Sequence, residues 1–409
     1  MNLADAFRDC WEGLAPIGLN AATGGYRRFA WTEEDLACRR WFRSQALARG
    51  LRVEDDRNGN LWAWWETAAA ARPAVVTGSH LDSVPDGGAF DGPLGVVSAL
   101  LAVDLLRDAG FRPTRAIAVA VFSDEEGARF GLSCVGSRLL GGFVDSAAAR
   151  GLRDAAGMTL DQAMRDAGAD PHRMGRDDER LAAITAFVEL HIEQGRALAD
   201  LGAPVAVVTR IWPHGRWHAS FTGEGNHAGT TRLIDRRDPL LPLASTVLAA
   251  RRIADECGAL ATIGRVAVEP NATNAVAVRA HAWLDARAGD DETLEHMIEA
   301  ITNAAVQAAA EHGVATSVRR ESFSPAVDFD VALAARLRDA LGRRGAPPPS
   351  LPTGAGHDAG ILAARIPTAM LVVRNPTGVS HSPDEHADID DCLEGVRALA
   401  AVLTELASE

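Results

Sequence analysis

Short apolar runs, each followed by polar residues, recur along the 409-residue chain. They occupy residues 74–76, 117–122, 184–190 and 370–373. An apolar run of this kind predicts a buried strand, and strands alternating with helical patterns predict a mostly parallel sheet. Because the carboxyl ends of parallel strands meet at one edge of a sheet, we expect the polar residues after these runs to form a site.

The pattern between the runs predicts helices, and it changes in the second half of the chain. Residues 3–50 predict two amphipathic helices around a break at Gly24–Gly25, and residues 93–107 predict a helix that begins near a proline. From about Ile211 the pattern predicts strands and helices of a different arrangement. The strands are at 217–221, 276–285 and 314–322, and the helices are at 240–256 and 292–311.

This change predicts two domains. Helix and strand resume at Val331, and a metal-type motif at His381 belongs with the first part of the chain. We therefore predict an α/β catalytic domain with a mostly parallel sheet, made of residues 1–210 and 326–409. An α+β domain of residues 211–325 is inserted between these two segments.

Charge excludes several classes of function. The formal net charge is -14, which argues against nucleic acid and anionic membranes as partners. All 41 basic side chains are arginine, and the absence of lysine excludes Schiff-base chemistry and the P-loop lysine. Arginine is left as the only permanent cation that can bind a substrate carboxylate.

The cysteines and the N-terminal sequence predict a cytoplasmic protein. No CxxC spacing occurs, and no apolar run reaches the ~18 residues of a membrane helix. The first residues lack the basic and apolar regions of a signal peptide. Reduced thiols are therefore expected at all five cysteines, which are Cys10, Cys38, Cys134, Cys257 and Cys392.

The polar residues after the apolar runs are of the types that bind divalent metals. They are His80, Asp82 and Asp91 after the first run, Glu125 and Glu126 after the second, His191 after the third and His381 after the fourth. Any one of these segments could be an acidic surface turn, but the recurrence at four strand ends favours a metal site. In a pair of adjacent carboxylates, one can bind metal while the other transfers protons.

Seven motifs together resemble a known family. They are HLD at 80–82, DGPLG at 91–95, DEEG at 124–127, HIEQG at 191–195, NHAGTT at 226–231, GAGHDA at 354–359 and GVSHSPDE at 378–385. This order resembles the amidase, hydantoinase and carbamoylase branch of the aminoacylase-like di-metal hydrolases. The resemblance runs from about Gly78 to Glu385, and it implies that the inserted domain is a lid and dimerisation domain.

The resemblance also implies two divalent ions in each subunit. His80 and His191 are expected to bind one ion, Glu126 and His381 the other, and Asp91 to bridge them. Zinc is expected, and manganese, cobalt and nickel also suit nitrogen and oxygen ligands.

The remaining site residues follow from the same resemblance. Glu125 is expected to be the general base and acid, and His227 to stabilise the oxyanion. Asp82 is expected to orient His80, although a strand-end turn aspartate is the alternative reading. The residues expected to contact substrate are Gln194, His227, Asn274, Arg287 and His357. On their own, most of these are ordinary loop and strand-end residues, and the roles of Glu193 and Arg374 stay open.

The implied activity is hydrolysis of an N-carbamoyl-L-amino acid to ammonia, carbon dioxide and the free amino acid. An allantoate amidohydrolase is the close alternative, because it shares the metal ligands. An N-acyl amino acid deacylase or an aminopeptidase fits the HIEQG and NHAGTT motifs less well. A non-catalytic binding protein is disfavoured, because all five ligand positions and Glu125 are present. A homodimer is expected, in which lid residues complete the neighbouring site.

Overall fold

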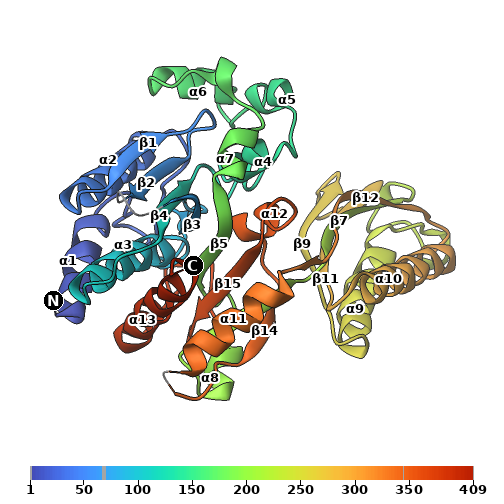
Figure 1. Cartoon of the computed structure of the whole chain (residues 1–409). Helices are drawn as coiled ribbons and strands as arrows, with labels where there is room; N and C mark the ends of the chain where they lie inside the picture. The colour runs from blue at the N-terminus through green and yellow to red at the C-terminus, as the bar shows by residue number, and fades with distance from the viewer. Residues whose placement is uncertain (1, 67–70, 344, 409) are drawn as a thin grey trace. The chain divides into compact units, whose positions relative to one another are not determined.

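The computed structural model describes residues 2–66, 71–343 and 345–408. The chain forms two compact units (Figure 1). Unit 1 comprises Met1–Thr209 and Asp328–Glu409, and unit 2 comprises Arg210–Val327. Unit 2 is thus an insertion in the sequence of unit 1.

The sheet of unit 1 has the strand order β1-β2-β4-β3-β5-β15-β6-β13, with β14 paired to β6. Strands β4, β3, β5 and β15 are parallel to one another, whereas β2 and β6 run antiparallel to them, and β1 pairs antiparallel with β2. The bounds are β1 Arg52–Asp55, β2 Leu61–Trp65, β3 Ala71–His80, β4 Arg115–Phe122, β5 Ile184–Ile192, β6 Val205–Ile211, β13 Val327–Asp328, β14 Ser350–Thr353 and β15 Thr368–Val373. The predicted mostly parallel α/β fold is confirmed.

Helices cover both faces of this sheet. One face packs against α3 (Pro93–Asp108) and α13 (Ile389–Leu406), with α1 (Leu3–Leu14), α2 (Glu33–Ala48) and α11 (Val331–Gly342) around them. The other elements are α4 Val135–Gly141, α5 Ser146–Arg150, α6 Leu160–Asp166, η1 Pro171–Arg173, α7 Asp178–Ala182, α8 Ala197–Leu201 and α12 Asp358–Leu362. Because both faces are covered, the central strands are almost continuously apolar.

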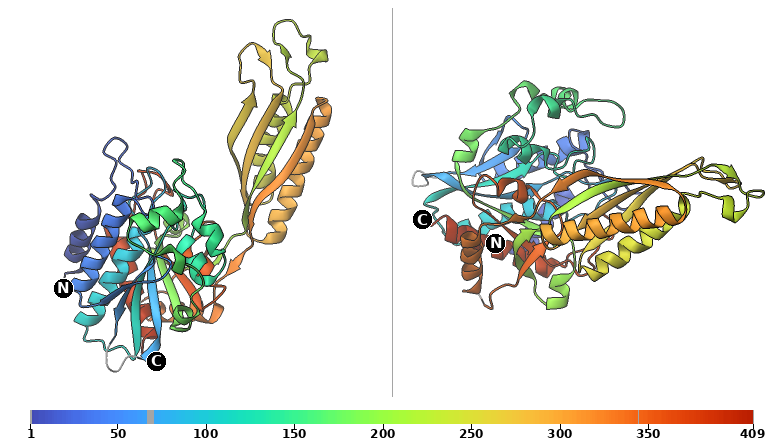
Figure 2. Two further views of the ribbon diagram at one scale, coloured as in Figure 1. Left: turned by 90° about the horizontal axis from the view of Figure 1, so that it is seen from above. Right: turned by 90° about the vertical axis from the view of Figure 1, so that its right-hand side faces the viewer.

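Unit 2 is an antiparallel sheet of order β12-β7-β11-β9 with α9 and α10 on one face (Figure 2). Along β7 and β11, buried residues that face the helices alternate with partly exposed residues. The bounds are β7 His214–Thr222, β8 Asn226–His227, η2 Leu233–Asp235, α9 Leu240–Glu256, β9 Leu260–Glu269, β10 Ala275–Val276, β11 Arg279–Arg287, α10 Asp291–Glu311 and β12 Ala315–Ser324. Among the described residues, no helix has the length and apolar character required to cross a bilayer.

Candidate metal centre and active site

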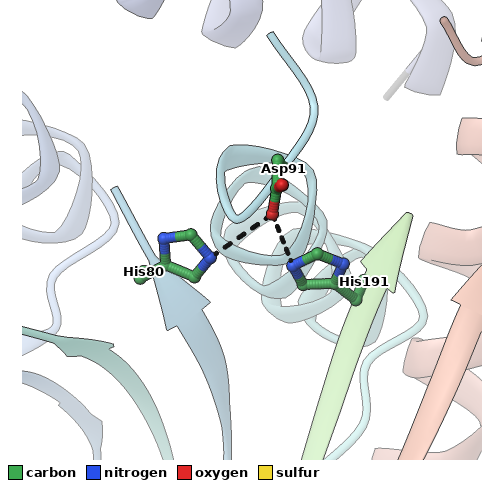
Figure 3. Close-up of side chains that lie close together, drawn as sticks. All are labelled: His80, Asp91 and His191. Atoms are coloured by element: carbon green, nitrogen blue, oxygen red, sulfur yellow. Dashed lines mark ion pairs between the residues drawn. The ribbon is translucent and has the colours of Figure 1, made fainter. Parts of the chain in front are cut away.

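The carboxyl ends of the parallel strands bring the predicted ligands together in unit 1. His80 is the last residue of β3, and His191 is the last but one of β5 (Figure 3). Asp91 lies in the loop before α3, where Gly92 adopts a φ of 87°. A Cβ at Gly92 would lie only 2.5 Å from the His80 ring, so glycine is required there. The DGPLG motif thus lets the Asp91 loop approach the histidine closely.

Asp91 is common to two groups of potential metal ligands. In the first, Asp91 Oδ1 lies 3.6 Å from His80 Nε2 and 3.1 Å from His191 Nε2 (Figure 3). In the second, Asp91 Oδ2 lies 3.3 Å from His381 Nε2, and that nitrogen is 3.7 Å from Glu126 Oε2. The two oxygens of one carboxylate are therefore divided between two groups, as a bridging ligand requires.

Backbone carbonyls fix the tautomers of the two buried histidines. His80 Nδ1 lies 3.1 Å from the carbonyl oxygen of Asp82, and His191 Nδ1 lies 2.9 Å from that of Ile192. A carbonyl oxygen only accepts hydrogen bonds, so each Nδ1 must carry the proton. The lone pair of each neutral ring is then on Nε2, which faces Asp91, as in metal-binding histidines.

The cluster attracts positive charge. Burial raises the pKa of Asp91, but the three imidazoles close to it, those of His191, His381 and His80, outweigh burial and hold this pKa well below its usual range. The hydrogen bond to Asp91 raises the pKa of His381 to about 9. Burial, together with the charge of Asp91, raises the pKa of Glu126 to about 7. These shifts show that the cluster retains protons, which offset its negative charge. Divalent cations bound at the same place would neutralise the same carboxylates.

Two buried atoms of the cluster make no hydrogen bond to any residue that the structure describes. They are His191 Nε2 and Glu126 Oε1. A buried polar atom without a partner is costly, and both atoms are good donors for zinc or manganese. The residues present therefore fit divalent metal ions.

Asp82 connects the histidine to the carboxylate pair. Its Oδ1 accepts the N–H of Glu125 at 3.1 Å, and its Oδ2 accepts that of Glu126 at 3.0 Å. Oδ1 also lies 3.5 Å from His80 Nδ1. Its main contacts are thus to the backbone of the DEEG motif, while its own carbonyl group orients His80.

Glu125 is buried beside the cluster. Its Oε2 lies 3.9 Å from His80 Nε2, and its Oε1 accepts the thiol proton of Cys134 at 3.3 Å. Burial raises the pKa of Glu125 well above its usual range, and the neighbouring carboxylates add to this effect. A carboxylate that holds a proton readily can both accept and return it during catalysis.

Comparison with known proteins agrees with this geometry. Residues 76–405 match the peptidase family M20/M25/M40. The chain belongs to this family. It is 36% identical to an N-carbamoyl-L-amino acid amidohydrolase of Geobacillus stearothermophilus, over 97% of this chain and 98% of the relative. It is 32% identical to an allantoate amidohydrolase of Escherichia coli, over 98% of both chains.

Solved structures give the same assignment. A hydantoinase/carbamoylase family amidase from Burkholderia multivorans superposes with a TM-score of 0.89 at 31% identity, covering 99% of this chain and 98% of that one. The resemblance inferred from the motifs is thereby confirmed. The M20 chain is a metal-dependent hydrolase of the amidohydrolase type, acting on carbon–nitrogen bonds.

Two other residues predicted to contact substrate lie beside the cluster of this M20 hydrolase. Gln194 Nε2 donates to Asp91 Oδ2 at 2.8 Å. His357 is buried, and its ring centroid lies 4.5 Å from that of His191. Burial holds the pKa of His357 well below its usual range, so its ring is neutral.

The two open residues of unit 1 have structural partners. Glu193 accepts hydrogen bonds from the N–H groups of Ala197 and Leu198 at 2.6 and 3.0 Å. It thus provides acceptors for backbone N–H groups at the start of α8, which have no partner within the helix. Arg374 forms two hydrogen bonds, at 2.7 and 2.8 Å, with Asp391 of α13. These contacts hold both side chains in place within unit 1.

Sequence reasoning missed two buried glutamates. Glu385 Oε1 accepts the N–H groups of Phe90 and Asp91 at 2.9 and 3.0 Å, although the residues are almost 300 positions apart. Glu189 accepts the Ser79 hydroxyl at 2.8 Å and the N–H of Ala359 at 2.9 Å. A glutamate in the otherwise apolar run 184–190, and one at the end of the GVSHSPDE motif, were the available signals.

We expect Glu385→Gln to lower metal affinity by about 10- to 100-fold, the usual effect of removing a partner that orients a ligand. An amide in this position can direct its NH₂ at the two N–H groups, and the Asp91 loop then loses its anchor. The measurement is metal content by mass spectrometry after dialysis against graded chelator. Asp384→Gln, an exposed neighbour, is the control; equal retention in both variants would remove the anchoring role.

The three predicted residues of unit 2 lie at two distant places. His227 and Asn274 are neighbours: β8 pairs with β10, and Asn274 O accepts the N–H of Ala228 at 3.1 Å. Arg287 is at the opposite end of β11, which spans about 26 Å at ~3.3 Å per residue. One small substrate therefore cannot contact His227 and Arg287 of the same unit 2.

The ring of His227 is held in one tautomer. Its Nδ1 accepts the N–H of Gly229 at 2.9 Å, so the proton of a neutral ring is on Nε2. The side chain is otherwise exposed. His227 therefore presents an N–H donor to its surroundings.

Proposed function

We propose that this M20 hydrolase removes the carbamoyl group from an N-carbamoyl-L-amino acid and releases ammonia, carbon dioxide and the amino acid. The observation that carries the proposal is the division of the Asp91 oxygens between two ligand groups, with buried Glu125 beside them. Two relatives with N-carbamoyl-L-amino acid amidohydrolase names, at 36% and 32% identity, support the substrate class.

The five ligand positions would hold two divalent ions, with zinc preferred. His80 and His191 would bind one, Glu126 and His381 the other, and Asp91 both. When bound, such ions polarise a carbonyl group and lower the pKa of water.

The chain itself supplies proton transfer. Cys134 occupies Glu125 Oε1, so Oε2 is the oxygen available to take a proton from the attacking water. Glu125 then returns this proton to the leaving nitrogen as the carbon–nitrogen bond breaks. Asp82 keeps Glu125 in place through the backbone N–H. Gln194 and His357 would contact the substrate from unit 1.

Unit 2 would act as a lid, and Arg287 would bind the substrate carboxylate. We expect Arg287→Ala to raise KM for ureido acids by about 10-fold or more, because a charge-assisted pair is lost, with a smaller change in kcat. Steady-state kinetics with an N-carbamoyl amino acid and its uncharged amide provide the check. With wild type, the uncharged amide should have a higher KM than the acid, and with Arg287→Ala the two KM values should be similar. A KM for the acid like that of the wild type would exclude the contact.

His227 and Asn274 would complete the site of a second subunit. The length of β11, about 26 Å from Arg279 to Arg287, supports this arrangement, because His227 and Asn274 lie beyond the Arg279 end. Strand β9 is a ten-residue edge of the sheet of unit 2, and it exposes Leu260 and Val266 at 54% and 55%. Leu248 of α9 is 73% exposed. A long edge with apolar side chains favours pairing with another copy.

Mixed dimers test this assignment. We expect Glu125→Gln and His227→Ala to be inactive separately, and a refolded equimolar mixture to regain up to about a quarter of wild-type activity. The reason is that half of the dimers would be mixed, and each would contain one intact site with Glu125 from one subunit and His227 from the other. A mixture that stays inactive, while sizing shows mixed dimers, would place His227 in its own subunit's site.

Allantoate is the alternative substrate, because relatives at 32% and 31% identity are named allantoate amidohydrolases. The deciding experiment measures ammonia and amine release from N-carbamoyl-L-amino acids, β-ureidopropionate, allantoate and N-acetyl amino acids. Zinc, manganese, cobalt and nickel are supplied in turn. Preference for carbamoyl amino acids is expected; preference for allantoate selects the alternative, and turnover of acetyl substrates alone would contradict both.

A further inference from the structure

A small cavity opens beside the metal-type cluster and is not used by the proposed mechanism. Its volume is about 90 Å³, which corresponds to about three water molecules. Gln194, whose amide donates to Asp91 Oδ2, forms part of its wall. The cavity is thus next to the bridging carboxylate of the cluster.

The floor of the cavity is apolar and lies on the same face of the sheet as His191. Val372 of β15 is in register with His191 of the parallel strand β5, so the two side chains lie side by side. Val208 of β6 pairs with Met370, and it shares this face because Val205 and Val207 point to the opposite core. Both valines are buried.

The walls come from the segment that carries His357. Leu351 and Thr353 of β14 and Gly354 after it line the cavity. The same segment continues to His357, whose ring is 4.5 Å from that of His191. One segment therefore forms a wall of the cavity and also carries a residue that packs against His191 of the cluster.

The charges of the lining exclude acidic groups. No lining residue carries a positive charge, and one lining residue, Glu193, is a carboxylic acid. Its carboxylate is already bonded to two backbone N–H groups of α8. A second carboxylate in the cavity would be desolvated and repelled, without a partner.

We infer that this cavity receives the side chain of the amino acid and selects short, neutral, aliphatic side chains. The inference rests on the proposed function, because it assigns a substrate side chain to the same site. It makes Val208, Val372 and Leu351 the residues that determine specificity.

The experiment compares kcat/KM for allantoate and for the N-carbamoyl derivatives of glycine, alanine, valine, phenylalanine and aspartate. Wild type should prefer alanine and valine over phenylalanine and aspartate. Val208→Phe fills the cavity and should lower the valine-to-glycine ratio by about 10-fold or more, because the glycine derivative has no side chain to place. Leu351→Ala enlarges the cavity and should raise the phenylalanine-to-alanine ratio by about 10-fold.

The controls separate this inference from the proposed function. Leu201→Ala, an exposed residue of α8, should leave all ratios unchanged. If wild type hydrolyses no ureido acid, the proposed function fails. If it does, but neither variant alters the ratios, the cavity has no role in specificity. If Val208→Phe impairs only allantoate hydrolysis, the cavity holds a ureido group and the aliphatic assignment is wrong. If Val208→Phe does not fold, the specificity ratios of Leu351→Ala decide the question alone, because Leu351 is partly exposed and its truncation is better tolerated.

Discussion

Glu125→Gln is expected to reduce kcat by about 10³-fold or more while the protein keeps its metal. General acid–base groups contribute about 10²–10⁴-fold, and glutamine has nearly the same shape but cannot accept the proton. The buried position beside His80, and the raised pKa, are the structural reasons. Steady-state kinetics and metal content of the same preparation provide the check.

The exposed Glu179 offers a matched control for this prediction. Glu179→Gln should have wild-type kcat, because its side chain is exposed and belongs to none of the potential ligand groups. A Glu125→Gln variant with wild-type turnover would show that another group moves the proton. Loss of metal in this variant would instead indicate that Glu125 helps to bind the ions.

Asp91→Asn is expected to have the second large effect, the loss of tight binding at both ligand groups. The Asp91 carboxylate faces three imidazoles and belongs to both ligand groups, so removing its charge weakens metal binding at both groups. We expect metal affinity to fall by more than ~100-fold, beyond the effect of losing an orienting partner. Isothermal titration with zinc of the metal-stripped protein measures both stoichiometry and affinity.

Asp384→Asn changes the same kind of side chain at an exposed position in the loop that carries His381. It should retain two ions per subunit. If Asp91→Asn lost only one ion and bound the other with unchanged affinity, Asp91 would be a ligand of a single group and the bridging role would be wrong.

The sequence predicted the centre of the sheet because its strands are buried on both faces. The runs 117–122, 184–190 and 370–373 became β4, β5 and β15. Glu125 and His191 follow the first two runs closely, and His381 lies in the loop after the third. Strands β1, β2 and β9 were not predicted. β9 is an edge strand with irregular burial, so it lacks the period of two that marks a half-buried strand.

The candidate site was predictable in its residue types, and less so in its contacts. Sequence placed His80, Asp91 and His191 at strand ends, but could not show that the Asp91 oxygens divide between two groups. It also could not show that Glu385 bonds to Asp91, since that contact depends on the complete fold of unit 1. The distance between His227 and Arg287 depends on the length and register of β11, which patterning located only within a few residues.

The two ligand groups are also separated in time during synthesis. His80, Asp91 and His191 emerge early, whereas Glu385 and His381 follow about 190 residues after His191. At ~5–20 residues per second, a ribosome needs about 10–40 seconds for that interval. Unit 2, made in between, can fold from its own contiguous residues meanwhile. A nascent chain can therefore assemble its first ligand group, but the second group and the Glu385 anchor await the last segment, so full metal loading is a late event in maturation.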